Sequence, residues 1–256
     1  MNNVFRIGPH IFTVAVLFFG IQQFIFLAWP AGPIPGPPWL SGGTLWACSL
    51  GLILIVCAVG IALKVGAHWA AGALMIVLLL RVMVLYLPGL LTSPHQPGNW
   101  TSAFELLAMA GASLVLLSLW SRSSSSGRGW KVPGRVGQIV FAASLVVFGV
   151  QHFIYARFVA TLVPSWIPAK LFWAYFVGAA FVAVAASILA RRITRLATAL
   201  LAAMFLLWFF ILHLPRVVLA AKDGNEWTSA FVALAMGGGA LILGRAESDQ
   251  SAVSTT

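Results

Sequence analysis

The sequence predicts an all-α integral membrane protein, with eight transmembrane helices arranged as two parallel four-helix repeats. Three observations support this prediction: a very apolar composition, eight apolar runs of spanning length, and a set of motifs that occurs twice. Of the 256 residues, 61% are hydrophobic and only 8% are charged, and the mean hydropathy is +0.99. About a quarter of the residues in a soluble domain are charged. A soluble monomer cannot bury so much apolar surface, so we expect the chain to lie in a lipid bilayer.

Each apolar run is long enough to cross a bilayer, because a hydrocarbon core of about 30 Å needs roughly 20 helical residues. We expect helices because an open strand or loop leaves backbone groups unpaired in lipid. The runs also lack the short alternating pattern of a membrane β-barrel. The predicted spans are Ile11–Trp29, Thr44–Leu63, Ala67–Leu87, Thr101–Trp120, Val136–Ala156, Leu171–Ala190, Leu196–Leu219 and Thr228–Gly244.

The two halves of the chain carry the same motifs in the same order. The matching segments are FGIQQFI (19–25) and FGVQHFI (148–154), Leu87-Pro88 and Leu214-Pro215, and WTSAFELLAM (100–109) and WTSAFVALAM (227–236). The offset is 148 − 19 = 129 residues early in the copies and 227 − 100 = 127 residues later. Because each copy holds an even number of spans, we expect both copies to have the same orientation in the membrane.

A polar segment, SRSSSSGRGWKVPGR at 121–135, separates the two copies. Its Ser, Gly and Arg content and its lack of apolar periodicity are typical of a solvated linker. The predicted division is a first repeat at 1–120, a cytoplasmic linker at 121–135, a second repeat at 136–245 and a disordered tail at 246–256.

The basic residues predict which ends of the helices face the cytoplasm. The formal charge of +10 comes from 15 Lys and Arg residues against 5 Asp and Glu residues. Ten basic residues fall on the side of the termini and the linker, four fall on the other side, and Arg81 lies within a span. The positive-inside rule therefore places both termini in the cytoplasm. Since the charges follow the loops, we do not expect a nucleic-acid partner; the expected partner is the lipid bilayer.

The motifs FGVQHF, LVPSWIP with the following FWAY, LHLPR and NEWTSAF resemble those of the DoxX-like family of small bacterial membrane proteins. The usual form of that family is one four-helix unit, so the resemblance covers nearly the whole chain, once per half. It implies a multi-pass protein of the bacterial cytoplasmic (inner) membrane. Some members are associated with membrane redox subunits that feed quinones or handle sulfur compounds, and others have no known activity. The resemblance assigns no catalytic residue.

Ionisable residues within the spans are candidates for a site, because such groups are costly in lipid and usually face a bundle interior or a cavity. Arg81 and Glu105 are predicted near the outer ends of two adjacent antiparallel spans, where an ion pair can form. The second repeat has Trp208 and Val232 at the equivalent positions, so both charges are absent there together. The alternatives are snorkelling of Arg81 to the headgroups and a capping box from Ser102 to Glu105 at a helix start.

Further polar side chains lie at a similar depth and are candidates for the same outward-facing pocket: Gln22, Gln23, Gln151 and His152. The alternative is that their amide and imidazole groups hold neighbouring helices together. His213 has the strongest claim to chemistry, because imidazole exchanges a proton near neutral pH. In the alternative interpretation, His213 bonds to carbonyl groups that Pro215 frees.

Six Trp residues fall near the outer helix ends and loops: Trp39, Trp46, Trp100, Trp166, Trp173 and Trp227. They are either walls of the pocket or members of the aromatic belt at the membrane boundary. No metal site is predicted, because two His residues without nearby Cys, Asp or Glu make a thin coordination shell. Phosphate-binding loops and Ser-His-Asp spacings are also not found.

Three hypotheses about function follow. The first is a quinone-linked or redox-associated membrane component, in which aromatic walls hold a flat ring and Arg81, His152 or His213 bonds to its oxygens. The second is a small-molecule or lipid transporter, which a duplicated unit with a polar interior favours. The third is a non-catalytic assembly or membrane-integrity factor. Quinone is the one candidate cofactor, and the sequence does not decide whether the protein is an enzyme.

Overall fold

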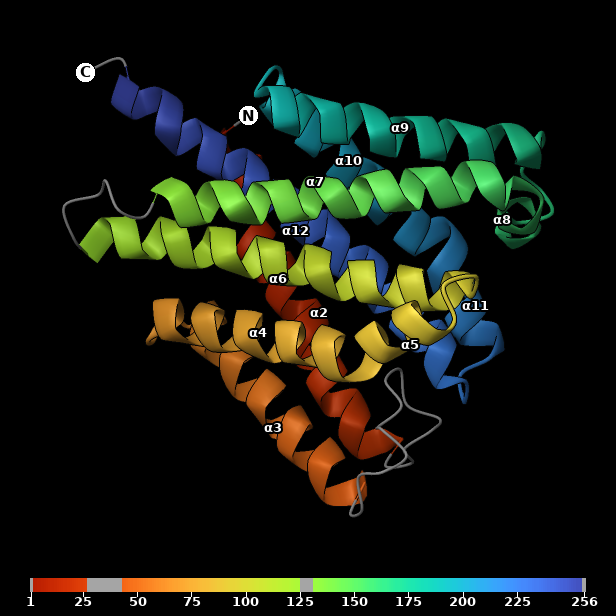
Figure 1. Ribbon diagram of the computed structural model, residues 1–256, viewed down its shortest axis with the longest axis horizontal. Coiled ribbons are helices and arrows are strands. Elements are labelled where there is room, and N and C mark those ends of the chain that lie inside the picture. The colour runs from red at the N-terminus through yellow and green to blue at the C-terminus, as the bar shows by residue number, and fades with distance from the viewer. Residues whose placement is uncertain (1, 27–42, 125–130, 255–256) are drawn as a thin grey trace.

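The computed structural model describes residues 2–26, 43–124 and 131–254, and in these ranges the secondary structure is helical, without strands. Figure 1 shows the arrangement. The helices are α1 (Asn2–Arg6), α2 (Gly8–Ile25), α3 (Gly43–Ala62), α4 (Ala67–Arg81), η1 (Val82–Tyr86), α5 (Leu87–Thr92), α6 (Pro97–Ser124), α7 (Lys131–Ile154), α8 (Ala156–Leu162), α9 (Lys170–Ala190), α10 (Thr194–Trp208), η2 (Phe209–His213), α11 (Leu214–Leu219) and α12 (Gly224–Ser254). The elements η1 and η2 are single π-helical turns.

Eight helical segments of the described chain are long and apolar enough to cross a membrane. They are Asn3–Ile25, Gly43–Ala62, Ala67–Thr92, Pro97–Ser121, Val132–Ile154, Lys170–Ala190, Thr194–Leu219 and Gly224–Glu247. Their outward surfaces are apolar, as at Leu200 and Val218, which are 61% and 72% exposed. Lipid tails solvate such side chains at little cost. The all-helical, multi-pass prediction is therefore confirmed.

The helices form a closed cycle of contacts with a central pair. In chain order α2, α3, α4, α6, α7, α9, α10 and α12 each contact the next, and α12 returns to α2. The central pair is α6 and α12, which also contact each other across the cycle. In the most apolar stretch of each of these two helices 67% of the residues are buried, against 22% for α4–α5 and 17% for α10–α11. Figure 1 shows α6 beside α7, with α9 on one side of them and α4 on the other.

Glycine pairs allow four of these contacts to be close. An added Cβ on the first glycine of each pair would lie 3.0 Å or less from the carbonyl oxygen of the second, so no side chain fits there. The pairs are Gly20 with Gly51 (2.8 Å), Gly149 with Gly178 (3.0 Å), Gly111 with Gly137 (2.6 Å) and Gly238 with Gly8 (3.0 Å). Small residues let the backbones of membrane helices approach, which strengthens their van der Waals packing.

The π-helical turns stand at the two Leu-Pro motifs. Proline lacks an N–H group and crowds the carbonyl four residues before it, and a local i→i+5 turn relieves that conflict. The N–H of Leu87 accordingly bonds to the carbonyl of Val82, and the N–H of Leu214 to that of Phe209. The third span therefore continues to Thr92 and does not stop at Leu87 as predicted.

The polar segments at 121–135 and 246–256 contain more helix than expected. The helix α6 reaches Ser124 and α7 begins at Lys131, so both ends of the predicted linker at 121–135 are helical. The helix α12 runs to Ser254, through most of the tail at 246–256 that was predicted to be disordered. Composition and the lack of apolar periodicity were the basis of the linker prediction, and Ala, Glu and Gln in the tail have high helix propensity.

Candidate functional site

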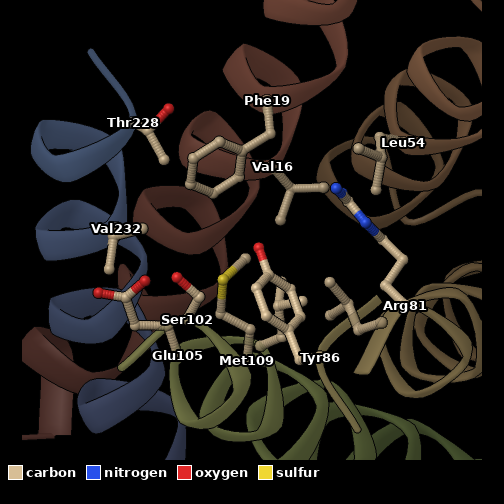
Figure 2. Close-up of a pocket in the computed structure, with 12 residues that line it drawn as sticks. Val16, Phe19, Leu54, Arg81, Tyr86, Ser102, Glu105, Met109, Thr228 and Val232 are labelled. Carbon is tan, nitrogen blue, oxygen red and sulfur yellow. The ribbon is translucent and has the colours of Figure 1, made fainter. Parts of the chain in front are cut away.

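A cavity of about 60 Å³ lies among the helices of the first half of the chain. Most of its wall comes from α2, α3, α4, η1 and α6, and α12 of the second half closes one side (Figure 2). The lining residues are Val16, Phe19, Leu54, Leu78, Arg81, Tyr86, Ser102, Glu105, Leu106, Met109, Thr228 and Val232. Of the residues predicted for the pocket, the structure brings Arg81 and Glu105 together here.

Arg81, the last residue of α4, is a deeply buried charge at this cavity, with 7% of its surface exposed. Its Nε and Nη2 atoms are buried and have no hydrogen-bond partner. The predicted ion pair with Glu105 is wrong as a direct contact, because these two atoms of Arg81 are unpartnered, whereas Glu226 does pair with Arg216. Figure 2 shows Arg81 and Glu105 at opposite sides of the cavity, with Tyr86 between them.

The π-helical turn explains why Arg81 and Tyr86 line the same cavity. In an α-helix, residues five apart point in directions about 140° apart around the axis. In the wider η1 turn, residues five apart lie closer to one direction, so both side chains reach the cavity. Tyr86 is 8% exposed. It was not among the predicted site residues, because an α-helical register puts it on another face; the Leu-Pro motif that follows it is the signal for the changed register.

Glu105 lies within α6 and not at its start. The helix begins at Pro97, so the predicted capping box from Ser102 to Glu105 is wrong. An N-terminal cap satisfies free amides of the first turn only, and Glu105 is two turns further along. Ser102 and Glu105 instead both line the cavity. The opposite helix α12 presents Thr228 and the apolar Val232 to them.

Gln22 and Gln151 hold helices of different halves together. Gln22 Nε2 donates to the carbonyl of Gly224 at 2.8 Å and to Thr228 Oγ1 at 3.0 Å. Gln151 Nε2 donates to the carbonyl of Pro97 at 3.0 Å, and its Oε1 accepts from Thr101 Oγ1 at 3.1 Å. Neither Gln22 nor Gln151 lines the cavity, so these two residues have the helix-linking role that was the alternative. Gln23 is also buried, and its Nε2 has no partner.

The two histidines lie away from the cavity. His152 Nδ1 is 2.8 Å from the carbonyl of Phe148, and its ring meets the edge of Phe181 at 5.2 Å. His213 ends η2, and its buried Nδ1 has no hydrogen-bond partner. The described residues contain no group of three or more His, Cys, Asp or Glu side chains that could hold a metal ion.

The tryptophans predicted as pocket walls do not line this cavity. Trp46 and Trp166 are 52% and 70% exposed, as expected of an aromatic belt. Trp100 Nε1 and Trp227 Nε1 each donate to a carbonyl six residues earlier, at 2.8 Å. Trp173 contacts Trp208 edge to face at 6.2 Å, and Trp39 lies outside the described residues.

In the second half, aromatic residues occupy three positions equivalent to lining residues of the cavity. At an offset of 127 residues, Phe181 corresponds to Leu54, Phe205 to Leu78 and Trp208 to Arg81. The rings of Phe181 and Phe205 are 5.5 Å apart, and Trp208 meets Trp173. The polar cavity therefore lies at a place where the sequences of the two halves differ.

A model of a family described as a domain of unknown function (DUF8561) matches residues 141–236. The match begins within α7 and ends within α12, so it covers much of the second half. No curated protein and no solved structure matches the chain.

Proposed function

We propose that this chain is a tandem duplication of a four-helix membrane unit, and that its first unit binds a small polar solute at Arg81. The second unit acts as a scaffold that closes the site through α12. The observation that carries the proposal is that Arg81, a residue with 7% exposure, lines a cavity while its buried Nε and Nη2 atoms lack hydrogen-bond partners.

The duplication is supported by contacts that recur at the offsets read from the sequence. Gln22 with Thr228 corresponds to Gln151 with Thr101, and the turn η1 corresponds to η2. The glycine pairs between α2 and α3 and between α7 and α9 correspond in the same way. The excess of basic residues on one side supports an orientation with both termini in the cytoplasm.

Solute binding explains why the chain keeps a buried, unpartnered arginine although its burial lowers the stability of the fold. A buried polar group without a partner costs about 1–3 kcal/mol, and more when it is charged. The equivalent position holds Trp208, which indicates that the unit folds with an aromatic residue there. An arginine kept at this place therefore fits a role in binding, because functional sites commonly hold groups that lower stability.

The size of the cavity favours a small solute over a quinone. A cavity of about 150 Å³ accepts a benzene ring, and this one has about 60 Å³. A quinone headgroup needs the cavity to widen, so the quinone-linked role and its redox subunits stay predictions, as does the resemblance to the DoxX-like family. An assembly factor has no use for the unpartnered donors. A transporter of small molecules would use these donors to bind its solute. We therefore favour a transporter of the bacterial inner membrane over an assembly factor.

Ligand-induced stabilisation tests the proposal. The full chain is purified in mild detergent and its thermal unfolding is followed with a panel of small polar solutes, since a ligand that binds the native state raises the unfolding temperature. We expect at least one solute to raise it in the wild type and not in Arg81→Met. The control is Arg157→Met, which removes an exposed arginine of α8. An equal response of Arg81→Met and wild type contradicts the proposal.

A further inference from the structure

We infer that the solute carries one carboxylate, bound by the Nε and Nη2 edge of Arg81, and that Glu105 selects a solute whose other end is an N–H donor or an ammonium group. This inference rests on the proposed function and narrows it to a chemical class: small monocarboxylates, with amino acids of a few atoms as the preferred members.

The two unpartnered atoms of Arg81 indicate the shape of the group that binds. Nε and Nη2 belong to one edge of the planar guanidinium, and their N–H bonds point the same way. Both atoms are buried in the solute-free structure, so a solute contacts them only when neighbouring side chains of the cavity shift. Two parallel N–H donors match the two oxygens of a planar carboxylate in a bidentate pair. Water or a single carbonyl oxygen can accept at one of these donors but does not reproduce the paired geometry.

Burial strengthens the preference for an anion at this end. Arg81 is only 7% exposed, and Glu105, the acidic residue of the cavity lining, makes no ion pair with it. A buried cation without a counter-ion is unfavourable, because desolvation removes water that would otherwise stabilise the charge. A carboxylate supplies both the charge and the two acceptors. Tyr86, which lies between Arg81 and Glu105 in Figure 2, also lines the cavity and provides a hydroxyl group.

Glu105 sets the charge that the far end of the cavity accepts. It lies across the cavity from Arg81, on the same wall as Ser102. Thr228 is already committed, because its hydroxyl donates to Gly224 and accepts from Gln22. An acidic group of the solute would therefore meet a like charge with little compensation, whereas an ammonium or N–H group meets an acceptor. Phosphate and dicarboxylates bring excess negative charge and are disfavoured.

The volume limits the size of the solute. A cavity of about 150 Å³ accepts benzene, which has six non-hydrogen atoms, so a cavity of about 60 Å³ favours a solute smaller than benzene. Acetate has four such atoms, glycine five and oxalate six. These three compounds are therefore similar in size. They differ in the group at the end of the molecule that faces away from Arg81, and this group is the feature under test.

Equilibrium binding of isotopically labelled glycine, acetate, oxalate and inorganic phosphate to the full chain in lipid nanodiscs tests the inference. We expect the wild type to bind glycine more tightly than acetate, and both more tightly than oxalate or phosphate. In Arg81→Lys, which keeps the charge but loses the parallel donors, glycine and acetate should bind about tenfold more weakly. In Glu105→Gln, acetate should still bind while the preference for glycine over acetate falls and oxalate binds more tightly.

The outcomes separate this inference from the proposed function. If phosphate or oxalate binds the wild type best and Arg81→Met abolishes that binding, the site exists and the class of solute is wrong. The class is also wrong if Arg81→Lys binds acetate as the wild type does. If none of the four probes binds, the carboxylate inference fails. The proposed function is then tested separately, by thermal unfolding of wild type and Arg81→Met with the panel of small polar solutes. A cooperative thermal unfolding transition of Arg81→Lys and Glu105→Gln without solute shows that both variants are folded.

Discussion

Gln22 donates a hydrogen bond to Thr228 at 3.0 Å, although 206 residues separate them in the chain. The contact joins α2 of the first half to α12 of the second, and Thr228 also lines the cavity that contains Arg81. The wall of the candidate site is thus completed by a helix from the other half. A single four-helix unit of this kind would need a second copy to supply the same wall.

Loss of this contact should lower stability by a modest amount. Replacing Gln22 with Leu keeps the volume and removes two hydrogen bonds to α12. We expect the free energy of unfolding to fall by about 0.6 kcal/mol for each bond, the average between membrane helices, and by no more than about 1.7 kcal/mol for each. Reversible unfolding in mixed detergent measures this, and Gln151→Leu, which breaks the corresponding contact with α6, should cost a similar amount. No loss of stability in either variant would contradict the assigned role.

The glycine contacts make a second prediction about packing. An added Cβ at Gly238 would lie 2.5 Å from the backbone nitrogen of Phe12, whereas an added Cβ at Gly98 has no atom within 4 Å. Gly238→Ala should therefore separate α12 from α2 and lower the free energy of unfolding by about 1–3 kcal/mol. Gly98→Ala is the matched control and should cost little or nothing. Equal effects of the two substitutions would show that close approach at Gly238 does not matter.

The π-helical turn should be required for binding but not for folding. Replacing Pro88 with Ala restores an N–H donor, which allows the turn η1 to close into an α-helix. Arg81 and Tyr86 would then point away from one another, and we expect the stabilisation by solute to be lost while the protein still folds. Pro215→Ala makes the same change at η2 and should leave solute binding intact. Thermal unfolding with and without solute compares the two, and retained binding in Pro88→Ala would contradict this account.

The arginine should lower the stability of the solute-free protein. In Arg81→Met the buried Nε and Nη2 groups are gone, so the free energy of unfolding without solute should rise by about 1–3 kcal/mol. Residues that lower the stability of the fold but are needed for function are common at binding sites. If Arg81 has only a structural role, the same substitution lowers the stability, and chemical unfolding of the two proteins distinguishes these results.

Sequence patterns predict most of the fold and only part of the site. Apolar runs determine the eight spans because lipid requires helices of a set length. The duplicated motifs indicated which helices correspond but not that α12 borders the first cavity, since packing across the halves is not a local property. The charges at Arg81 and Glu105 were found because ionisable groups are rare in lipid. Tyr86 was missed because a one-residue change of register follows from the π-helical turn.

The most direct test of solute binding at Arg81 is mass spectrometry of small molecules that co-purify with the protein in mild detergent. The account predicts that a small carboxylate is carried by the wild type and by Arg157→Met, and that it is absent from Arg81→Met. Wild-type protein that carries no small polar solute, or an Arg81→Met variant that carries the same one in equal amount, would contradict the central claim.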